Sequence, residues 1–176
     1  MQNLKDTKTA LDRAARLVAE RPAFGQRTYY ATATLNGSME CLIREKHHDL
    51  IADVPPGMGG TDQGPSPSCL LRAAMASCVA IGIRSFAIRA EVEVEQVQVR
   101  FETDVDARGQ LGVCASAAPG FEAGRLQISV YSCETPDAVK AVVQQSLTLS
   151  PMLDAVRCRT PIETCVKVIL TQETAR

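Results

Sequence analysis

The chain has 176 residues, of which 45% are hydrophobic and 22% charged, so it is long enough for one globular domain and is typical of a folded protein. The net charge is −1, and no basic excess favours nucleic acid or an anionic membrane as a partner. No uninterrupted apolar run approaches the roughly 20 residues of a membrane span, and the N-terminus lacks the apolar region of a signal peptide. We therefore expect a cytoplasmic protein that binds neither nucleic acid nor membrane.

Seven cysteines are present, an odd number, and their spacing never gives a Cys-x-x-Cys pair. The only histidines, His47 and His48, are adjacent, and neighbouring side chains on a strand point to opposite faces. We therefore expect no disulfide framework, no metal site and no cofactor.

The first third of the chain changes from a helical to a strand pattern. Residues 3–21 have the apolar stripe of an amphipathic helix, with Asn3 as its cap and Pro22 after its end. Three strands are expected between residues 27 and 53, the first two joined by a two-residue turn at Asn36-Gly37. We divide the chain into an N-terminal helical extension, residues 1–24, and a single domain, residues 25–176.

A loop rich in glycine and proline precedes the longest apolar run. Residues 67–90 hold only three charges and do not alternate, which predicts a helix buried on most faces, with Ser66 as its cap. The loop lacks the patterns of phosphate-binding loops, and its prolines remove backbone donors. Because so apolar a helix needs more cover than one chain offers, we expect an obligate homodimer.

The second half alternates again. Strands are expected at residues 97–105 and 126–130, a helix at 136–149 entered at Thr135, a short helix starting at Ser150-Pro151, and a last strand from Ile162 to Leu170. The order of strands and helices indicates an α+β fold with mainly antiparallel sheets.

Cys78 is the thiol that stands out, because it lies in the middle of the apolar helix. Leu71, Met75, Cys78 and Gly82 share one stripe at helical spacing. Cys78 is about three turns from the helix N-terminus, too far to benefit from the helix dipole, and Arg72 projects from a different face. From the residues alone, Cys78 is a packed thiol.

The segment GGTDQGPSPSCLLRAAMASCVAIGIRSFA resembles the hallmark of the OsmC/Ohr family, the osmotically inducible and organic hydroperoxide resistance proteins. The shared pattern is a glycine-rich loop, a proline, a run of Leu and Ala, and a cysteine, Cys78, eleven residues after Pro67. The resemblance covers about residues 25–172. It implies an intertwined homodimer in which antiparallel sheets pack around long central helices and the active sites lie at the subunit interface.

Catalytic members of the family reduce organic hydroperoxides. The resemblance implies that Cys78 attacks the peroxide, that a second cysteine in a Cys-Pro pair resolves the sulfenic acid, and that an arginine and a glutamate prepare the first thiolate. Ser150-Pro151 stands at the Cys-Pro pair, and Ser68 or Cys69 stands at the glutamate. The hairpin at Asn36-Gly37 carries no arginine.

Substitutes for these supporting groups are therefore considered. Arg27 or Arg44 would serve as the cation, and His47 or His48 as a proton relay, although turn histidines usually face solvent.

Two functions follow from this site, and a different thiol chemistry or a purely structural role is the remaining alternative. In the first, the chain is a thiol peroxidase that uses Cys78, and an external thiol or one of Cys69, Cys133, Cys158 and Cys165 resolves the sulfenic acid. In the second, catalysis has been lost and the dimer binds a small apolar or electrophilic molecule in the interface pocket. Cys133 and Cys165 are expected to be packing residues. Cys158, between two arginines, has either a lowered pKa or an incidental exposed position.

Overall fold

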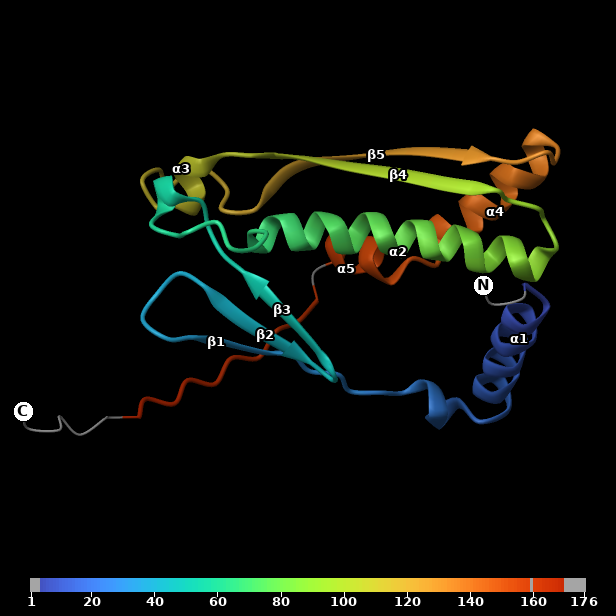
Figure 1. The fold of residues 1–176 in the computed structure, drawn as a ribbon, viewed down its shortest axis with the longest axis horizontal. Coiled ribbons are helices and arrows are strands. Elements are labelled where there is room, and N and C mark those ends of the chain that lie inside the picture. The colour runs from blue at the N-terminus through green and yellow to red at the C-terminus, as the bar shows by residue number, and fades with distance from the viewer. Residues whose placement is uncertain (1–3, 159, 170–176) are drawn as a thin grey trace, which may run out of the picture.

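The structure is a computed structural model that describes residues 4–158 and 160–169 (Figure 1). Its elements, in chain order, are α1 (Leu4–Glu20), the 3₁₀ turn η1 (Pro22–Gly25), β1 (Thr32–Leu35), β2 (Cys41–Glu45), β3 (His48–Ala52), the 3₁₀ turn η2 (Pro56–Met58), α2 (Pro67–Ala90), β4 (Gln96–Val105), α3 (Ala107–Gln110), β5 (Phe121–Tyr131), α4 (Pro136–Thr148) and α5 (Pro151–Arg157). The expected α+β class with antiparallel sheets is confirmed.

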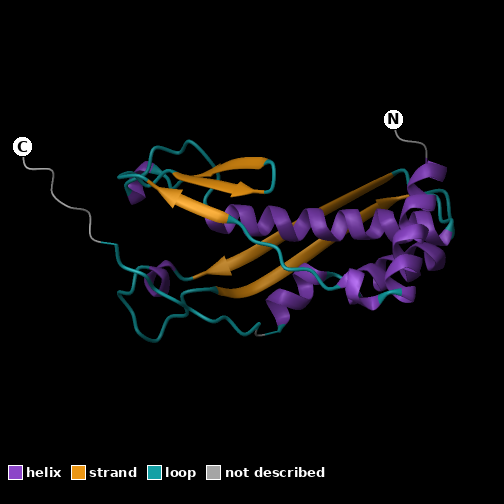
Figure 2. Cartoon of the chain, turned by 90° about the horizontal axis from the view of Figure 1, so that it is seen from below, coloured by secondary structure: helices purple, strands orange, loops and turns teal. Residues whose placement is uncertain are grey.

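Helix α2 forms at the predicted residues. Ser66 caps it by accepting a hydrogen bond from the Cys69 N–H, and Pro67 occupies the first turn, where no intrahelical donor is lost. Met75, Val79, Ile83 and Ala87, spaced by four residues, are its buried face. They form the core together with inward residues of β4, β5 and α4, so that α2 lies along the long sheet (Figure 2).

The expectation that no segment is long and apolar enough for a membrane span needs correction. By length and composition alone, α2 passes that test, and it is the only helix among the described residues to do so. Its Leu, Ile, Val and Ala residues keep the mean hydropathy of α2 high although the helix contains three arginines. α2 packs against β4, α4 and α5, but the expected burial on most faces is wrong within one chain, because only Met75, Val79, Ile83 and Ala87 are buried.

Two separate sheets make up the β structure. β4 and β5 form a long antiparallel ribbon whose inner positions, such as Val99 and Ile128, pair across the strands and face α2. β1, β2 and β3 form a meander in which β2 is central. Most residues of this meander are exposed, and in Figure 1 it stands away from the body of α2.

The predicted two-residue turn at Asn36-Gly37 is wrong. Leu35 pairs with Cys41, so the connection between β1 and β2 takes five residues, with Gly37 at φ +78°. The tight turn lies instead between β2 and β3, where Glu45 pairs with His48 and Lys46 adopts φ +54°. An Asn-Gly pair permits a left-handed turn, but the strand register decides where the tight turn falls.

The predicted last strand is also wrong within the described residues. Residues 160–169 have no strand pairing, and the alternating Ile162, Val166 and Val168 are 85%, 80% and 78% exposed. Leu170, the end of the prediction, lies outside the described residues, as does the expected cap Asn3 of the first helix. An alternating segment becomes a strand only where another strand lies beside it, and within the described part of one chain none does.

Helix α1 packs against the C-terminal end of α2 through charged side chains. Asp12 pairs with Arg89 at 3.4 Å, and Lys8 pairs with Glu91 at 3.6 Å. None of the residues of α1 is buried. Exposed ion pairs stabilise little, so α1 is held loosely compared with the core.

Asp53 organises the loop that leads from β3 into α2. Its carboxylate, 2% exposed, accepts hydrogen bonds from the backbone N–H groups of Val54, Thr61 and Gln63 and from the Thr61 hydroxyl, at 2.7, 3.0, 3.1 and 2.9 Å. Gly60 is required here, because a Cβ would lie 1.9 Å from the Val54 carbonyl oxygen. One buried carboxylate thus fixes the start of α2.

These hydrogen bonds, the Gln63 N–H foremost, lower the pKa of Asp53 from 3.8 to about 2 despite its burial. A carboxyl with a lowered pKa in the folded state stabilises that state above the unfolded pKa. We expect the stability due to Asp53 to be complete above about pH 5 and lost as the pH falls through about 2. Chemical unfolding of wild type and Asp53→Asn from pH 2 to 7 tests this. A gap between the two proteins that does not shrink below pH 4 would contradict it.

Candidate functional site

Cys78 on α2 faces Ser150, the residue that caps α5. The Cys78 Sγ lies 3.7 Å from the Ser150 Oγ, and the same hydroxyl accepts a hydrogen bond from the Leu153 N–H at 3.4 Å. Ser150 is 5% exposed, whereas Cys78 is half-buried. Among the described residues, Ser150 is the only side chain that hydrogen-bonds to Cys78. The site is therefore a thiol and a hydroxyl brought together from positions 72 residues apart.

The residues of the predicted stripe on α2 differ in their burial and in their neighbours. Met75 is fully buried in the core, whereas Leu71 is exposed. Gly82, one turn after Cys78, lies against α4: a Cβ built on Gly82 would be 2.5 Å from the Oγ of Ser146. Cys78 and Gly82 thus face the α4–α5 junction, and this junction is the wall of the site.

Ser146 is a residue that the sequence analysis missed. It is 2% exposed, and its Oγ is the one buried side-chain polar atom in the described part of the chain without a hydrogen-bond partner. Its helical spacing indicated only a core-facing position on α4. The crossing with Gly82, which brings it near Cys78, depends on tertiary packing that no local pattern reveals.

Arg72 does not reach Cys78, as expected from its place on the helix. Its Nη2 donates to the Sγ of Cys69 at 3.0 Å, and its Nη1 lies 3.4 Å from the Oγ1 of Thr103. The Ser66 Oγ donates to the same sulfur at 3.2 Å. The pKa of Cys69 is lowered, chiefly by the Ser66 hydrogen bond and then by the positive charge of Arg72.

The thiol of α2 whose pKa is lowered is therefore Cys69, in the first turn. The groups that lower it, Ser66 and Arg72, do not contact Cys78. The sequence offered a signal that was not used: a capping serine three residues before Cys69 and an arginine three residues after it. Ser68, the other position considered for the family glutamate, has its Oγ 3.2 Å from the Ser66 Oγ. Cys69 and Cys78 lie on one unbroken helix, too far apart for a disulfide.

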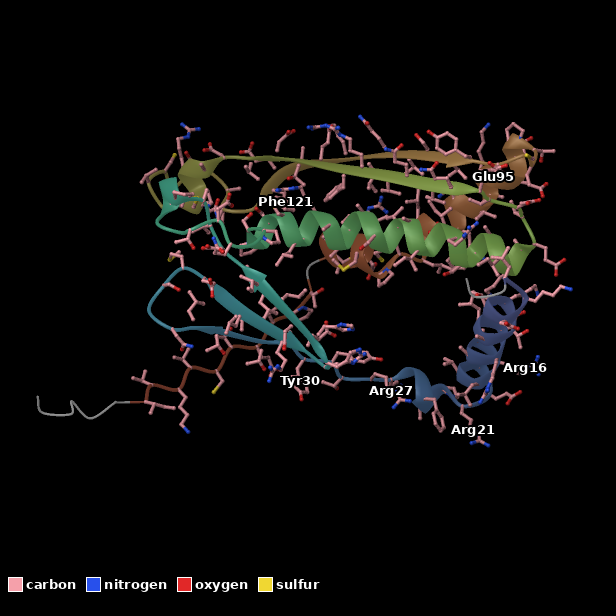
Figure 3. The ribbon with its side chains drawn as sticks, viewed as in Figure 1. Arg16, Arg21, Arg27, Tyr30, Glu95 and Phe121 are labelled. Carbon is pink, nitrogen blue, oxygen red and sulfur yellow. The ribbon has the colours of Figure 1, made fainter. Side chains whose placement is uncertain are left out.

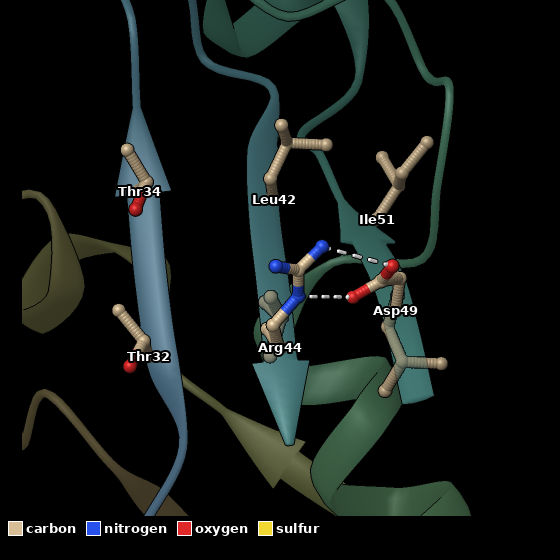
Figure 4. A pocket seen from close by; sticks show the side chains of 8 residues that line it. Thr32, Thr34, Leu42, Arg44, Asp49 and Ile51 are labelled. Atoms are coloured by element: carbon tan, nitrogen blue, oxygen red, sulfur yellow. Dashed lines mark hydrogen bonds and ion pairs between the residues drawn. The ribbon is translucent and has the colours of Figure 1, made fainter. Parts of the chain in front are cut away.

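The remaining predicted residues lie elsewhere within one chain. Arg44 forms an ion pair with Asp49 at 2.7 Å across β2 and β3 (Figure 4). That pair lines a groove of about 580 Å³ on the meander, to which neither Cys78 nor Ser150 contributes.

Arg27 donates to the Phe24 carbonyl oxygen and lies, with Tyr30, on the segment between η1 and β1, away from α2 (Figure 3). His47 and His48 are exposed at the tight turn, their ring centroids 4.0 Å apart. The structure thus brings none of these four predicted residues to Cys78.

Two of the other cysteines differ from their predicted roles. Cys133, expected to pack, is exposed, and Glu95 raises its pKa by accepting its hydrogen bond. Cys158 is exposed, as the second of its two alternatives expects, and Asp154 raises its pKa more than Arg157 lowers it. Cys165, also expected to pack, is exposed on the unpaired segment. The described residues contain no cluster of three His, Cys, Asp or Glu side chains that could hold a metal ion.

We expect alkylation by iodoacetamide to show the lowered pKa of Cys69. The pH at which Cys69 alkylation reaches half its maximal rate should lie below that of Cys133 in the same protein, because a thiolate is the reacting form. Arg72→Gln and, more strongly, Ser66→Ala should raise the value for Cys69 and leave Cys133 unchanged. Peptide mapping by mass spectrometry across pH measures both thiols at once. Equal values for the two thiols would contradict the assignment.

Comparison with solved structures gives the same architecture. An OsmC-like protein from Mycoplasma pneumoniae superposes with a TM-score of 0.64 at 14% identity, over 75% of this chain and 89% of that chain. An organic hydroperoxide resistance protein from Elizabethkingia anophelis gives a TM-score of 0.58 at 18% identity, over 76% and 91%. The organic hydroperoxide resistance protein OsmC from Legionella pneumophila gives 0.55 at 21% identity, over 74% and 90%. At these identities the likeness shows the fold.

No curated protein sequence matches the chain. Residues 60–164 match the model of the OsmC-like protein family. This match spans the second part of the glycine-rich loop, α2 and the α4–α5 junction, and it covers more than half of the chain. The chain therefore belongs to the OsmC-like protein family.

Proposed function

We propose that the protein reduces organic hydroperoxides through Cys78. The observation that carries this proposal is the 3.7 Å contact between the Cys78 Sγ and the Ser150 Oγ. The family resemblance implies a pair of cysteines at these two positions, and the fold juxtaposes the positions although the second residue is a serine. The solved relatives named as organic hydroperoxide resistance proteins support the same chemistry.

The reaction balances as a two-electron oxidation of sulfur. The Cys78 thiolate attacks the terminal oxygen of the hydroperoxide, an S–O bond forms and the O–O bond breaks, which leaves a sulfenic acid and an alkoxide that takes up a proton. A low-molecular-weight thiol then condenses with the sulfenic acid, releasing water, and a second thiol frees Cys78 as the external disulfide forms. Because Cys133 and Cys158 are exposed with raised pKa values, an external thiol is the better reductant.

Treatment with cumene hydroperoxide tests the proposal. Wild type should gain one oxygen on Cys78 and then be over-oxidised to sulfinic acid, because no second thiol of the described residues faces it. Ser150→Cys should instead give a disulfide between Cys78 and the introduced thiol, with release of water, since the side chains at the two positions already touch. Intact mass and peptide mapping distinguish these products.

Thr148→Cys is the matched control, because Thr148 is an exposed hydroxyl residue at the same junction whose Oγ1 donates to the Gln144 carbonyl oxygen. It should be over-oxidised like wild type. Cys78→Ser should lose the oxygen that peptide mapping assigns to position 78, and oxygen on the separate Cys69 peptide does not count toward this reaction. If Cys78 stays unmodified in every variant, the peroxidase proposal fails.

One observation favours the second function. No described cationic side chain contacts Cys78. Arg72, the nearest arginine in sequence, contacts Cys69 and Thr103 instead. Without a neighbouring cation, the site would serve instead as a binding pocket for a small apolar or electrophilic molecule. An unmodified Cys78 after hydroperoxide treatment, together with adduct formation by an electrophile such as N-ethylmaleimide, would support that function.

We further propose that the working form is a homodimer. The chain has an accessible surface of 14,073 Å², whereas a compact protein of 18.9 kDa has about 8,300 Å². Obligate dimers bury about 2,000–5,000 Å² or more in total, so a second copy would cover a substantial part of this excess. The uncovered surfaces are the Ala74, Ser77 and Ile81 stripe of α2, the meander with Leu42 and Leu50, and the alternating segment 162–169.

Sedimentation should therefore give a particle of twice the 18.9 kDa chain mass. Ile81 is 66% exposed in one chain, so Ile81→Lys should leave a monomeric protein unaffected but should dissociate or unfold a dimer whose interface includes α2. Val113→Lys, at a loop residue that is 73% exposed, is the control and should sediment as wild type does. A stable, folded wild-type monomer at micromolar concentration would contradict the dimer. In that dimer, Arg27 or Arg44 would have to reach Cys78 from the second copy.

A further inference from the structure

The buried hydroxyl of Ser146 has no partner in the resting protein. It is 2% exposed, and no donor or acceptor of the described residues hydrogen-bonds to its Oγ. A buried polar atom without a hydrogen bond lowers the stability of the fold, and alanine would fill the same helix position without that cost. The neighbouring serine, Ser150, is by contrast engaged with both Leu153 and Cys78.

The hydroxyl points at α2 beside Gly82, one turn after Cys78. A Cβ built on Gly82 would be 2.5 Å from the Ser146 Oγ and 3.8 Å from the Ser146 Cβ, so the oxygen leads the side chain toward α2. Gly82 follows Cys78 by one turn, and side chains so related are about 5–6 Å apart at their Cβ atoms. The Ser146 Oγ makes no hydrogen bond to the sulfur, and it lies about one turn of α2 from Cys78, at the distance where an oxygen atom bound next to that sulfur would be reached.

The chemistry of peroxide reduction places such an atom there. When a thiolate attacks one oxygen of the O–O bond, the leaving oxygen lies beyond the attacked one, away from the sulfur, and it gains negative charge as the bond breaks. A donor that stabilises it must be displaced from the sulfur by about one oxygen atom. A preorganised donor in a buried site stabilises such charge more strongly than water does.

We propose that Ser146 donates a hydrogen bond to the leaving oxygen of the hydroperoxide attacked by Cys78. The inference rests on the proposed function and adds to it the group that stabilises the departing alkoxide. No electron passes through Ser146, and its proton stays on the hydroxyl until the alkoxide is protonated from solvent. Ser146 is thus kept unpartnered until substrate binds.

The rate of Cys78 oxidation by cumene hydroperoxide in Ser146→Ala tests the proposal. The second-order rate constant should fall about ten- to a hundredfold, the effect of losing one hydrogen bond to a developing charge. The Tm should stay equal or rise, because an unpartnered buried hydroxyl has been removed. Thr9→Ala, at an exposed residue of α1 whose Oγ1 donates to a backbone carbonyl oxygen four residues earlier, is the control and should change neither quantity.

Alkylation of Cys78 by iodoacetamide separates this role from packing, because iodide leaves without needing a hydrogen-bond donor. Ser146→Ala should alkylate at the wild-type rate. If its oxidation is as fast as in wild type, or if oxidation and alkylation slow together, the role of Ser146 is overturned while Cys78 chemistry stands. If wild-type Cys78 does not react with hydroperoxide at all, the proposed function itself fails and the inference falls with it.

Discussion

Burial of α2 is the constraint on which the rest of the structure depends. Its four-residue-spaced face of Met75, Val79, Ile83 and Ala87 is covered by the β4–β5 ribbon, and the Cys78–Gly82 side is covered by α4 and α5. The third side, which includes Ile81, has no cover within the described part of one chain. A single helix therefore supplies the centre of the core and carries both Cys69 and Cys78. Its third side is an exposed apolar surface. The position of the site follows from the way α4 and α5 cover one side of this helix.

The two thiols of α2 occupy contrasting environments. Cys69 lies in the first turn of α2, where a hydroxyl and a guanidinium stabilise its thiolate. Cys78 lies deeper, against a neutral hydroxyl, in a site whose polar atoms are serines. Neutral hydroxyls carry no net charge of their own, but they can accept or donate a hydrogen bond as the sulfur changes state. At such a site the sulfur has hydroxyl groups and a bound substrate as its interaction partners, and no fixed cation.

Features set by residues close in sequence were predicted, whereas features that depend on contacts between distant segments were missed. The bounds of α2 and the caps Ser66 and Ser150 were predictable because capping and helical spacing act within a few residues. The meeting of Cys78 with Ser150 came from the family resemblance rather than from spacing. The segment from Ile162 failed as a strand because pairing depends on a neighbour far away or in another molecule. Ser146 was missed for the same reason, since its importance arises from a crossing with Gly82.

The meander β1–β3 is joined to the core mainly through the loop that Asp53 fixes, whereas α2, β4, β5, α4 and α5 are contiguous in sequence and in space. Loop closure among contiguous elements is cheap in entropy, so the α2–α5 unit can become ordered while the meander is still opening and closing locally. We expect the backbone amides of the two units to exchange with solvent on different timescales. Amide exchange in β1–β3 reports the docking of this sheet, and exchange in β4 and β5 reports global unfolding.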